Sequence, residues 1–271
     1  TIDINPNVAY KVSDKLSIGA GVSLQYAKAE LGQTAMGGRM DAVVNGDSWA
    51  WGFNLGLMYQ PTETLRFGLS YRSQIAHDAE GNIKTFANAN GVGMPAFNGD
   101  DFKVRVTTPD TAMATATWEA TQDLRLSGLI RWARWSNLDQ LDISSSSVLG
   151  QLGYPGGVKV NHYDWEDTWL FSVGADYRLN GQWTVRGGLA YETGAVGEAQ
   201  NRPATIPDVD RVWLSLGGTY HYNKQIQFDF GATWLMGVGN MDLCQEGTSN
   251  KIGEYDSMDA YIVGAQVQYR F

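Results

Sequence analysis

The stretch WEDTWLFSVGADYRLNGQWTVRGGLAYE, residues 165–192, alternates between apolar and polar side chains with a period of two. Such alternation predicts two β-strands, each with one apolar and one polar face. Asn180 and Gly181 lie between the two strands and suit the two positive φ angles of a type I′ hairpin turn. The rest of the chain repeats this hairpin, so the sequence predicts an all-β, antiparallel fold.

Aromatic side chains stand at both ends of the apolar face of these strands, with smaller residues between them. Trp169 and Tyr177 mark the first strand, and Trp183 and Tyr191 mark the second. Aromatic residues at both ends of strand after strand form the two girdles of a sheet that crosses a lipid bilayer. A soluble sandwich also alternates, but it has no reason for such girdles. The pattern therefore predicts a transmembrane β-barrel.

The composition agrees with a barrel and argues against other classes. Nothing changes abruptly along the 271 residues, so we expect one domain, residues 1–271. No window approaches the roughly 18 consecutive apolar residues of a transmembrane helix. The mean hydropathy of −0.28 is compatible with a barrel, because a spanning strand is only half apolar. A net charge of −9 argues against a nucleic-acid partner, and the single Cys244 excludes an internal disulfide.

The alternation predicts eleven strands, joined by connections that are short and long in turn. They lie near residues 8–12, 16–26, 51–59, 65–71, 111–120, 124–132, 168–179, 183–192, 212–222, 226–236 and 261–271. Long loops are predicted at 32–47, 76–106, 137–164, 193–209 and 237–258; the second is the longest and has room for strand extensions above the membrane. In outer-membrane barrels the short turns lie in the periplasm and the long loops outside.

The odd strand count leaves the two ends of the sheet on opposite sides of the membrane. A complete bacterial barrel has an even count and both termini on the inner side, and unpaired edges in lipid are costly. We therefore expect an odd number of upstream strands to be missing. The start at Thr1, without a Met or an apolar signal segment, fits a processed or truncated chain.

Four stretches resemble the FadL family of outer-membrane transporters for long-chain fatty acids and other hydrophobic compounds. They are NPNVAYKVSDKLSIGAGVSLQYAKAEL at 5–31, FGLSYRS at 67–73, TPDTAMATATWEATQDLRLSGLIRWARWSNL at 108–138 and IPDVDRVWLSLGGTYHYNK at 206–224. The resemblance extends from Asn5 to Phe271, and IPDVDRVWLS is its most specific part.

This resemblance implies a monomeric barrel of fourteen strands that a small N-terminal hatch plugs. The hatch and the first three strands, including a kinked strand for lateral exit into the bilayer, would then be absent from this sequence. The family also ends in an aromatic residue, here Phe271, that the barrel-assembly machinery reads.

Charged residues on the polar face are expected to line the lumen. They are Arg66, Arg72, Arg125, Arg131, Arg178, Arg186, Arg211 and Arg270, with Glu119, Asp176, Glu192 and Asp229. One interpretation is a network of paired charges that keeps the lumen open and solvated. The other is that one or two arginines bind the carboxylate of a fatty acid, because a guanidinium matches a carboxylate with two hydrogen bonds. Arg72, Arg131 and Arg211 are the candidates, since they lie toward the outer halves of their strands.

Apolar residues in the longest loop suggest a second contact with a ligand. Phe86, Val92, Met94 and Phe97 lie in a polar surrounding. They form either a capture surface for hydrophobic molecules or a patch that packs the loop onto the barrel rim. Phe86, Met94 and Phe97 therefore join the arginines as candidate ligand-binding residues.

The sequence predicts no catalytic site. The three histidines, His77, His162 and His221, are far apart, and none lies near the inward Ser172 or Ser215 by strand register. We therefore expect no enzyme.

The sequence predicts no metal site either. Asp208 and Asp210 are more readily explained as a loop anchor, with Pro207 fixing the turn and Arg211 pairing with an aspartate. The acidic loop that contains Asp242, Glu246, Glu254 and Asp256 could bind a cation that bridges to lipopolysaccharide, but we favour a solvated loop.

The sequence thus predicts a passive outer-membrane channel for long-chain fatty acids, in contact with lipopolysaccharide and outer-membrane lipid and without a nucleotide or redox cofactor. Two alternatives remain. One is an aromatic-hydrocarbon channel of the same family, in which the lumen arginines are structural. The other is a structural or receptor barrel, such as an adhesin or phage receptor, in which the loops carry the function.

Overall fold

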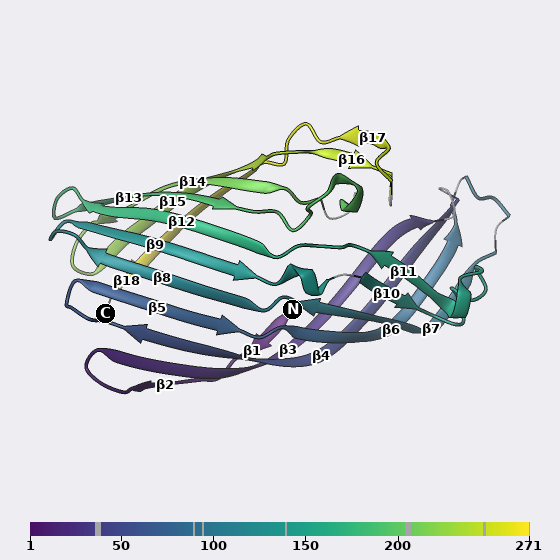
Figure 1. The fold of residues 1–271 in the computed structure, drawn as a ribbon, viewed down its shortest axis with the longest axis horizontal. Helices are drawn as coiled ribbons and strands as arrows, with labels where there is room; N and C mark the ends of the chain where they lie inside the picture. The colour runs from purple at the N-terminus through teal and green to yellow at the C-terminus, as the bar shows by residue number, and fades with distance from the viewer. Residues whose placement is uncertain are drawn as a thin grey trace.

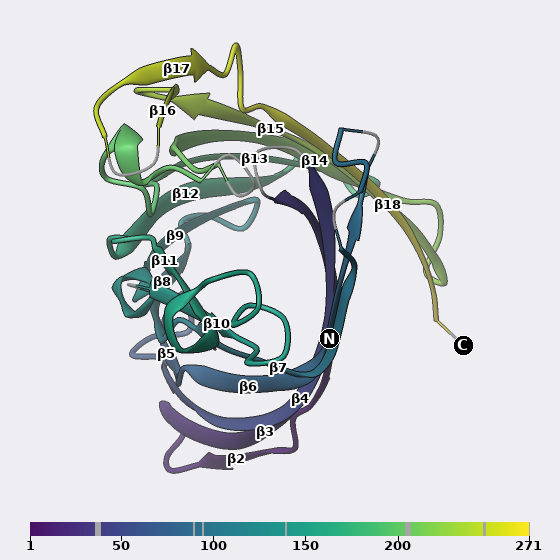
Figure 2. The ribbon, with the colours of Figure 1, turned by 90° about the vertical axis from the view of Figure 1, so that its right-hand side faces the viewer.

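The computed structural model describes residues 1–35, 39–88, 90–93, 95–138, 140–203, 207–245 and 248–270. Its main feature is one curled antiparallel sheet (Figures 1 and 2). The wall strands are β1 (Ile2–Ile4), β2 (Asn7–Lys11), β3 (Leu16–Ala35), β4 (Met40–Tyr59), β5 (Leu65–Arg72), β8 (Thr111–Glu119), β9 (Leu124–Ala133), β12 (Thr168–Arg178), β13 (Trp183–Glu192), β14 (Asp210–His221), β15 (Ile226–Val238) and β18 (Ala260–Tyr269). β1 and β2 both pair with β3 in one continuous register, so they form the first of the eleven predicted strands.

The sheet curls through an arc whose two ends are β2 and β18 (Figure 2). Over the described residues these two strands are not paired with each other. In the same part of the chain, no helix is long and apolar enough to cross a membrane. The only helical segments there are the short 3-10 turns Trp135–Asn137, Pro155–Gly157 and Ala199–Asn201.

Contacts between strands that are not neighbours identify the concave face of the sheet. Arg131 on β9 reaches Glu192 on β13, although β12 lies between them. Arg186 on β13 reaches Asp229 on β15, across β14. Strands two places apart are separated by roughly 10 Å, so such side chains meet most readily when they point toward the inside of the curve. The charged face therefore lines the lumen, and the apolar face with its aromatic girdles is the lipid-facing outer surface.

The short turns share one capping device. A side-chain oxygen at the start of each turn accepts a hydrogen bond from the backbone N–H three residues later, where the next strand begins. These pairs are Ser13 with Leu16, Thr62 with Leu65, Thr121 with Leu124, Asn180 with Trp183, and Asn223 with Ile226, at 2.8–3.1 Å. Polar side chains of this kind replace the missing backbone partners of a turn. The predicted type I′ turn is wrong, because neither Asn180 nor Gly181 has a positive φ.

Two of the predicted loops contain long strand extensions. β3 and β4 have 20 residues each and stay paired up to Ala35 and Met40, so the prediction of an irregular loop at 32–47 is wrong for its described part. β4 pairs with β5 through residues 54–59 and with β6 (Ile75–Ala87) through residues 40–47. β6 then pairs with β7 (Phe97–Thr108), which confirms the extensions expected within 76–106.

These extensions build a small hydrophobic core at the end of the barrel opposite to the short turns (Figure 1). β10 (Gln140–Ser144) joins β7, and β11 (Val158–His162) joins β10. The buried residues of this core are Ile83, Phe102, Val148 and Leu149. Asp101 anchors the segment after β10 that contains Val148 and Leu149. Its carboxylate accepts hydrogen bonds from the Ser145 hydroxyl at 2.6 Å and from the Ser147 N–H at 2.9 Å. These bonds hold the pKa of Asp101 well below its usual range.

Candidate functional site

Two of the three predicted arginines meet at one carboxylate in the outer half of the lumen. Arg131 Nη2 lies 2.6 Å from Glu192 Oε1, and Arg211 Nε lies 3.7 Å from Glu192 Oε2. Arg211 Nη2 also contacts Asp208 Oδ1 at 2.8 Å. Glu192 is buried, with only 7% of its surface exposed. We call these four residues the outer ion cluster.

Strand register explains why the outer ion cluster forms. Arg131 and Glu192 both pair with Leu170 of β12, from its two sides, and Glu192 pairs with Arg211 on β14. The three charged residues therefore lie in one row across the sheet. All of them point into the lumen, where the curvature brings their side chains together.

Arg72 belongs to a separate cluster near the first strand. Its guanidinium pairs with Asp3 and donates to the Ser23 hydroxyl at 3.1 Å. Asn5 extends this cluster, since its Nδ2 donates to the Ser23 hydroxyl and its Oδ1 accepts a hydrogen bond from Asn54 Nδ2 at 3.1 Å. The structure thus brings Arg131 and Arg211 together but holds Arg72 with a different acid.

A second belt of paired charges, which we call the lower belt, lies in the lumen near the short turns. Arg125 contacts Glu119 at 2.7 Å and Asp176 at 3.6 Å. Arg186 contacts Asp176 at 3.5 Å and Asp229 at 3.8 Å. These contacts form a network of paired charges. Such a network is one of the two arrangements expected from the sequence for the charged residues of the lumen.

The predicted apolar loop residues have different surroundings. Phe97 begins β7 and packs against the core of Ile83 and Phe102. Phe86 lies near the end of β6 and is 46% exposed. Met94 lies outside the described residues, as do Glu246 of the acidic loop and the terminal Phe271. The structure therefore places Phe97 in the loop core and leaves Phe86 accessible.

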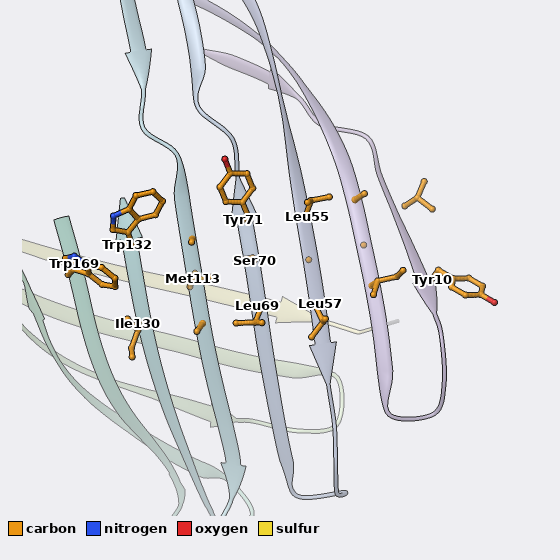
Figure 3. Close-up of a pocket in the computed structure, with 17 residues that line it drawn as sticks. Tyr10, Leu55, Leu57, Leu69, Ser70, Tyr71, Met113, Ile130, Trp132 and Trp169 are labelled. Carbon is orange, nitrogen blue, oxygen red and sulfur yellow. The ribbon is translucent and has the colours of Figure 1, made fainter. Parts of the chain in front are cut away.

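The lipid-facing surface carries a shallow apolar depression of about 910 Å³ that extends from β2 over β3, β4, β5, β8 and β9 to β12. Figure 3 shows Leu55, Leu69 and Ile130 among its lining residues. The girdle residues Tyr71 and Trp132 line it as well. Ala112 and Ala114 are the small residues of β8 between the larger side chains of β5 and β9. Because these residues belong to the outer face, the depression contacts membrane lipid and is not part of the lumen.

Aspartates at the outer rim bind the last aromatic donor of the neighbouring strand. The Tyr71 hydroxyl donates to Asp110 at 2.5 Å, Trp132 Nε1 donates to Asp167 at 2.8 Å, Trp234 Nε1 donates to Asp259 at 3.2 Å, and the Tyr191 hydroxyl donates to Asp210. Asp208 and Asp210 are thus engaged by Arg211 and Tyr191, which confirms the loop anchor predicted for IPDVDR. Within the described ranges, no three metal-ligating side chains converge.

Sequence reasoning missed a buried contact between a serine and a histidine. Ser48 Oγ lies 2.8 Å from His77 Nδ1, and His77 Nε2 lies 2.9 Å from Gln25 Oε1. Both Ser48 and His77 are buried, so the contact ties β6 to β3 and β4 and leaves little access for a substrate. Burial lowers the pKa of His77. The contact depends on β6 pairing back onto β4, for which the sequence has no local signal.

The chain is similar to known outer-membrane proteins along its whole length. The family described as outer membrane protein transport protein (OMPP1/FadL/TodX) matches residues 1–271. The long-chain fatty acid transport protein of Escherichia coli strain K12 is 28% identical over 293 residues, which cover 88% of this chain and 60% of that protein. Outer membrane protein P1 of Haemophilus influenzae strain Rd is 28% identical over 273 residues, covering 87% of this chain and 56% of that protein. The chain therefore spans about 60% of the length of the curated relatives it matches.

Solved structures have the same fold. A Pseudomonas aeruginosa FadL homologue superposes with a TM-score of 0.74 at 21% identity, covering 98% of this chain and 65% of the other. The Ralstonia pickettii toluene transporter TbuX superposes with a TM-score of 0.66 at 21% identity, covering 97% of this chain and 66% of the other. The family that the sequence resembles is thus confirmed: the chain belongs to the OMPP1/FadL/TodX family of outer membrane transport proteins.

Proposed function

We propose that this protein is a passive channel that carries long-chain fatty acids, or similar hydrophobic molecules, across the outer membrane. The observation that supports this most is the outer ion cluster, in which two arginines from different strands converge inside the lumen of a family transport barrel. Guanidinium groups suit the head group of a fatty acid because each donates two parallel hydrogen bonds to a carboxylate.

The proposed path has three stages. Apolar residues of the outer loops, with Phe86, Met94 and Phe97 as candidates, first capture the hydrophobic molecule. The molecule then enters the lumen, where Arg72, Arg131 or Arg211 meets its carboxylate. Release follows without a nucleotide, a redox cofactor or a chemical step. The partners are then the ligand, the surrounding lipid and lipopolysaccharide, and the assembly machinery that reads Phe271, for a barrel that acts as a monomer.

An aromatic-hydrocarbon channel is the second candidate. One observation favours it: each of the three arginines already has a carboxylate partner, Asp3 for Arg72 and Glu192 for the other two. A neutral substrate would leave these pairs intact. The Ralstonia pickettii toluene transporter TbuX, whose substrate is a neutral hydrocarbon, has the same fold as this chain.

Binding of radiolabelled dodecanoate to the full-length protein in detergent tests the proposal. The series Arg72→Ala, Arg131→Ala and Arg211→Ala locates the head group. Saturable binding that one substitution weakens supports a carboxylate ligand. Failure of dodecanoate to bind, together with saturable binding of toluene, would replace the fatty acid with an aromatic hydrocarbon.

A receptor or adhesin barrel predicts a different result from a loop deletion. Removal of residues 76–106, which contain the β6–β7 extension, should abolish uptake if this loop captures the ligand. Unchanged uptake by a correctly folded deletion variant would contradict a capture role for the loop.

A further inference from the structure

Glu192 has the position of an internal competitor for the two arginines. Its buried carboxylate contacts Arg131 with one oxygen and faces Arg211 with the other, at 2.6 and 3.7 Å. A ligand carboxylate that binds between the same arginines would have to take over these contacts. The two arginine side chains are 41% and 28% exposed, so they remain accessible from the lumen.

Arg211 is incompletely satisfied in this arrangement. Its Nε atom is buried and makes no hydrogen bond in the part of the chain that the structure describes. The indole Nε1 of Trp213 is also buried and makes no hydrogen bond among the described residues. Trp213 follows Arg211 by two residues and lies on the same inner face of β14. Buried donors of this kind are rare in folded proteins and call for an acceptor. One such donor within the outer ion cluster and a second on the next inward residue of the same strand point to an acceptor that arrives with a ligand.

The charges of the cluster set how tightly a carboxylate would be held. Arg131 and Arg211 carry two positive charges, and Glu192 and Asp208 carry two negative charges, so the cluster is neutral at rest. An arriving carboxylate gives the cluster one net negative charge, because Glu192 stays in the lumen even when it gives up an arginine. The displaced Glu192 carboxylate is buried and loses its partner, and this cost offsets part of the gain from the new pair and keeps the bound state weak.

We infer that Glu192 competes with the ligand carboxylate for Arg131 and Arg211 and thereby limits how long the lumen retains an anionic ligand. This inference rests on the proposed function, because it assumes that the ligand carries a carboxylate. Weak retention suits a channel, since conduction requires a site that binds well enough to admit the ligand but not so well that release is slow. Glu192 would then be the residue that favours release.

The test compares dodecanoate with its neutral counterpart, dodecanol, on the full-length protein in detergent at an alkaline pH. Glu192→Gln keeps the size and a hydrogen-bond acceptor but removes the competing charge. We expect this substitution to tighten dodecanoate binding about tenfold, the equivalent of one charge-assisted hydrogen bond, and to leave dodecanol binding unchanged. Glu119→Gln is the matched control, because it also breaks an arginine–glutamate pair, at 2.7 Å, but in the lower belt. It should change neither affinity.

Each other outcome has a defined meaning. Equal dodecanoate affinity in the Glu192→Gln variant and the unaltered protein would overturn the role of Glu192 while leaving the proposed function standing. Tighter binding of both ligands would also overturn it, since a general loosening of the lumen would then be the cause. No dodecanoate binding to the unaltered protein would defeat the proposed function itself. If Glu192→Gln does not fold, as judged by heat-modifiable migration on gels, Glu192→Ala, which also removes the charge, replaces it; an unchanged ratio of dodecanoate to dodecanol affinity in that variant would count against competition.

Discussion

The hydroxyl of Tyr71, the last outward aromatic of β5, donates a 2.5 Å hydrogen bond to Oδ1 of Asp110, the residue before β8. The same oxygen accepts the backbone N–H of Gln74 at 3.1 Å. Asp110 is 7% exposed, so one buried carboxylate fixes both a girdle residue and the backbone where the chain leaves the wall. Trp132 with Asp167 repeats the arrangement, since Asp167 also accepts the Ser136 N–H at 3.2 Å.

This contact predicts a coupled loss of stability. Tyr71→Phe should lower the free energy of unfolding by about 1–2 kcal/mol, because it removes a donor to a buried carboxylate. Asp110→Ala should cost more, since it also removes the acceptor for Gln74. Urea unfolding of the barrel in lipid vesicles measures both. The double variant should be less destabilised than the sum of the single ones, and strict additivity would contradict the contact.

The short turn between β12 and β13 gives a second prediction. Asn180→Ala should lower the free energy of unfolding by about 0.5–1.5 kcal/mol, because the Asn180 side chain accepts the N–H groups of Gln182 and Trp183 at 2.8 and 2.9 Å. Gly181→Ala should be neutral within about 0.5 kcal/mol, since Gly181 has no positive φ and no atom lies within 4 Å of an added Cβ. A type I′ turn would reverse this order, with Gly181→Ala the more costly change.

The buried His77 predicts that the stability of the β6–β7 hairpin depends on pH. Burial lowers its pKa below the ordinary value of 6.5, so the unfolded hairpin binds a proton more readily than the folded one. The contribution of neutral His77 to the stability of the folded hairpin is therefore fully present above the ordinary pKa of 6.5. It is lost as the pH falls through the lowered pKa of the folded state. Ser48 and Gln25, the groups bonded to the ring, are uncharged and do not oppose this. Protease cleavage within residues 75–108 should be faster at about pH 5 than at about pH 8.

The control for this prediction is His77→Gln, which cannot take up the proton. Its cleavage rate should be higher at both pH values, because the fit with Ser48 is lost, but the ratio of the two rates should fall toward that of an unrelated loop. An equally large pH effect in the variant would assign the pH dependence to other groups.

The wall of the barrel could be predicted from the sequence because each spanning strand carries its own signal. A strand such as Thr168–Arg178 faces lipid on one side and the lumen on the other, so polarity alternates at every residue. In the extension of β4 beyond the wall, residues 41–46 are all half-buried, and the alternation disappears. The upper part of β4 reads MDAVVNGD at 40–47, which has no regular apolar face, so the sequence predicts a loop where the strand continues.

The candidate site could be predicted only in part, for a related reason. The inward direction of Arg131, Glu192 and Arg211 follows from parity along each strand. Their convergence depends on the register of β9, β12, β13 and β14 together, which no single strand encodes. The contact of Ser48 with His77 is harder still to foresee, because it requires β4 to change its partner from β5 to β6.

Uptake by living cells is the most direct test of transport by this protein. The full-length protein is produced in Gram-negative cells that lack a fatty-acid transporter of their own, and the accumulation of radiolabelled dodecanoate is followed over time. We predict saturable uptake well above that of cells with an empty vector, and a lower rate for the Arg131→Ala and Arg211→Ala variants at equal amounts of folded barrel. Uptake no faster than in the empty-vector cells, with the barrel folded in the outer membrane, would contradict fatty-acid transport.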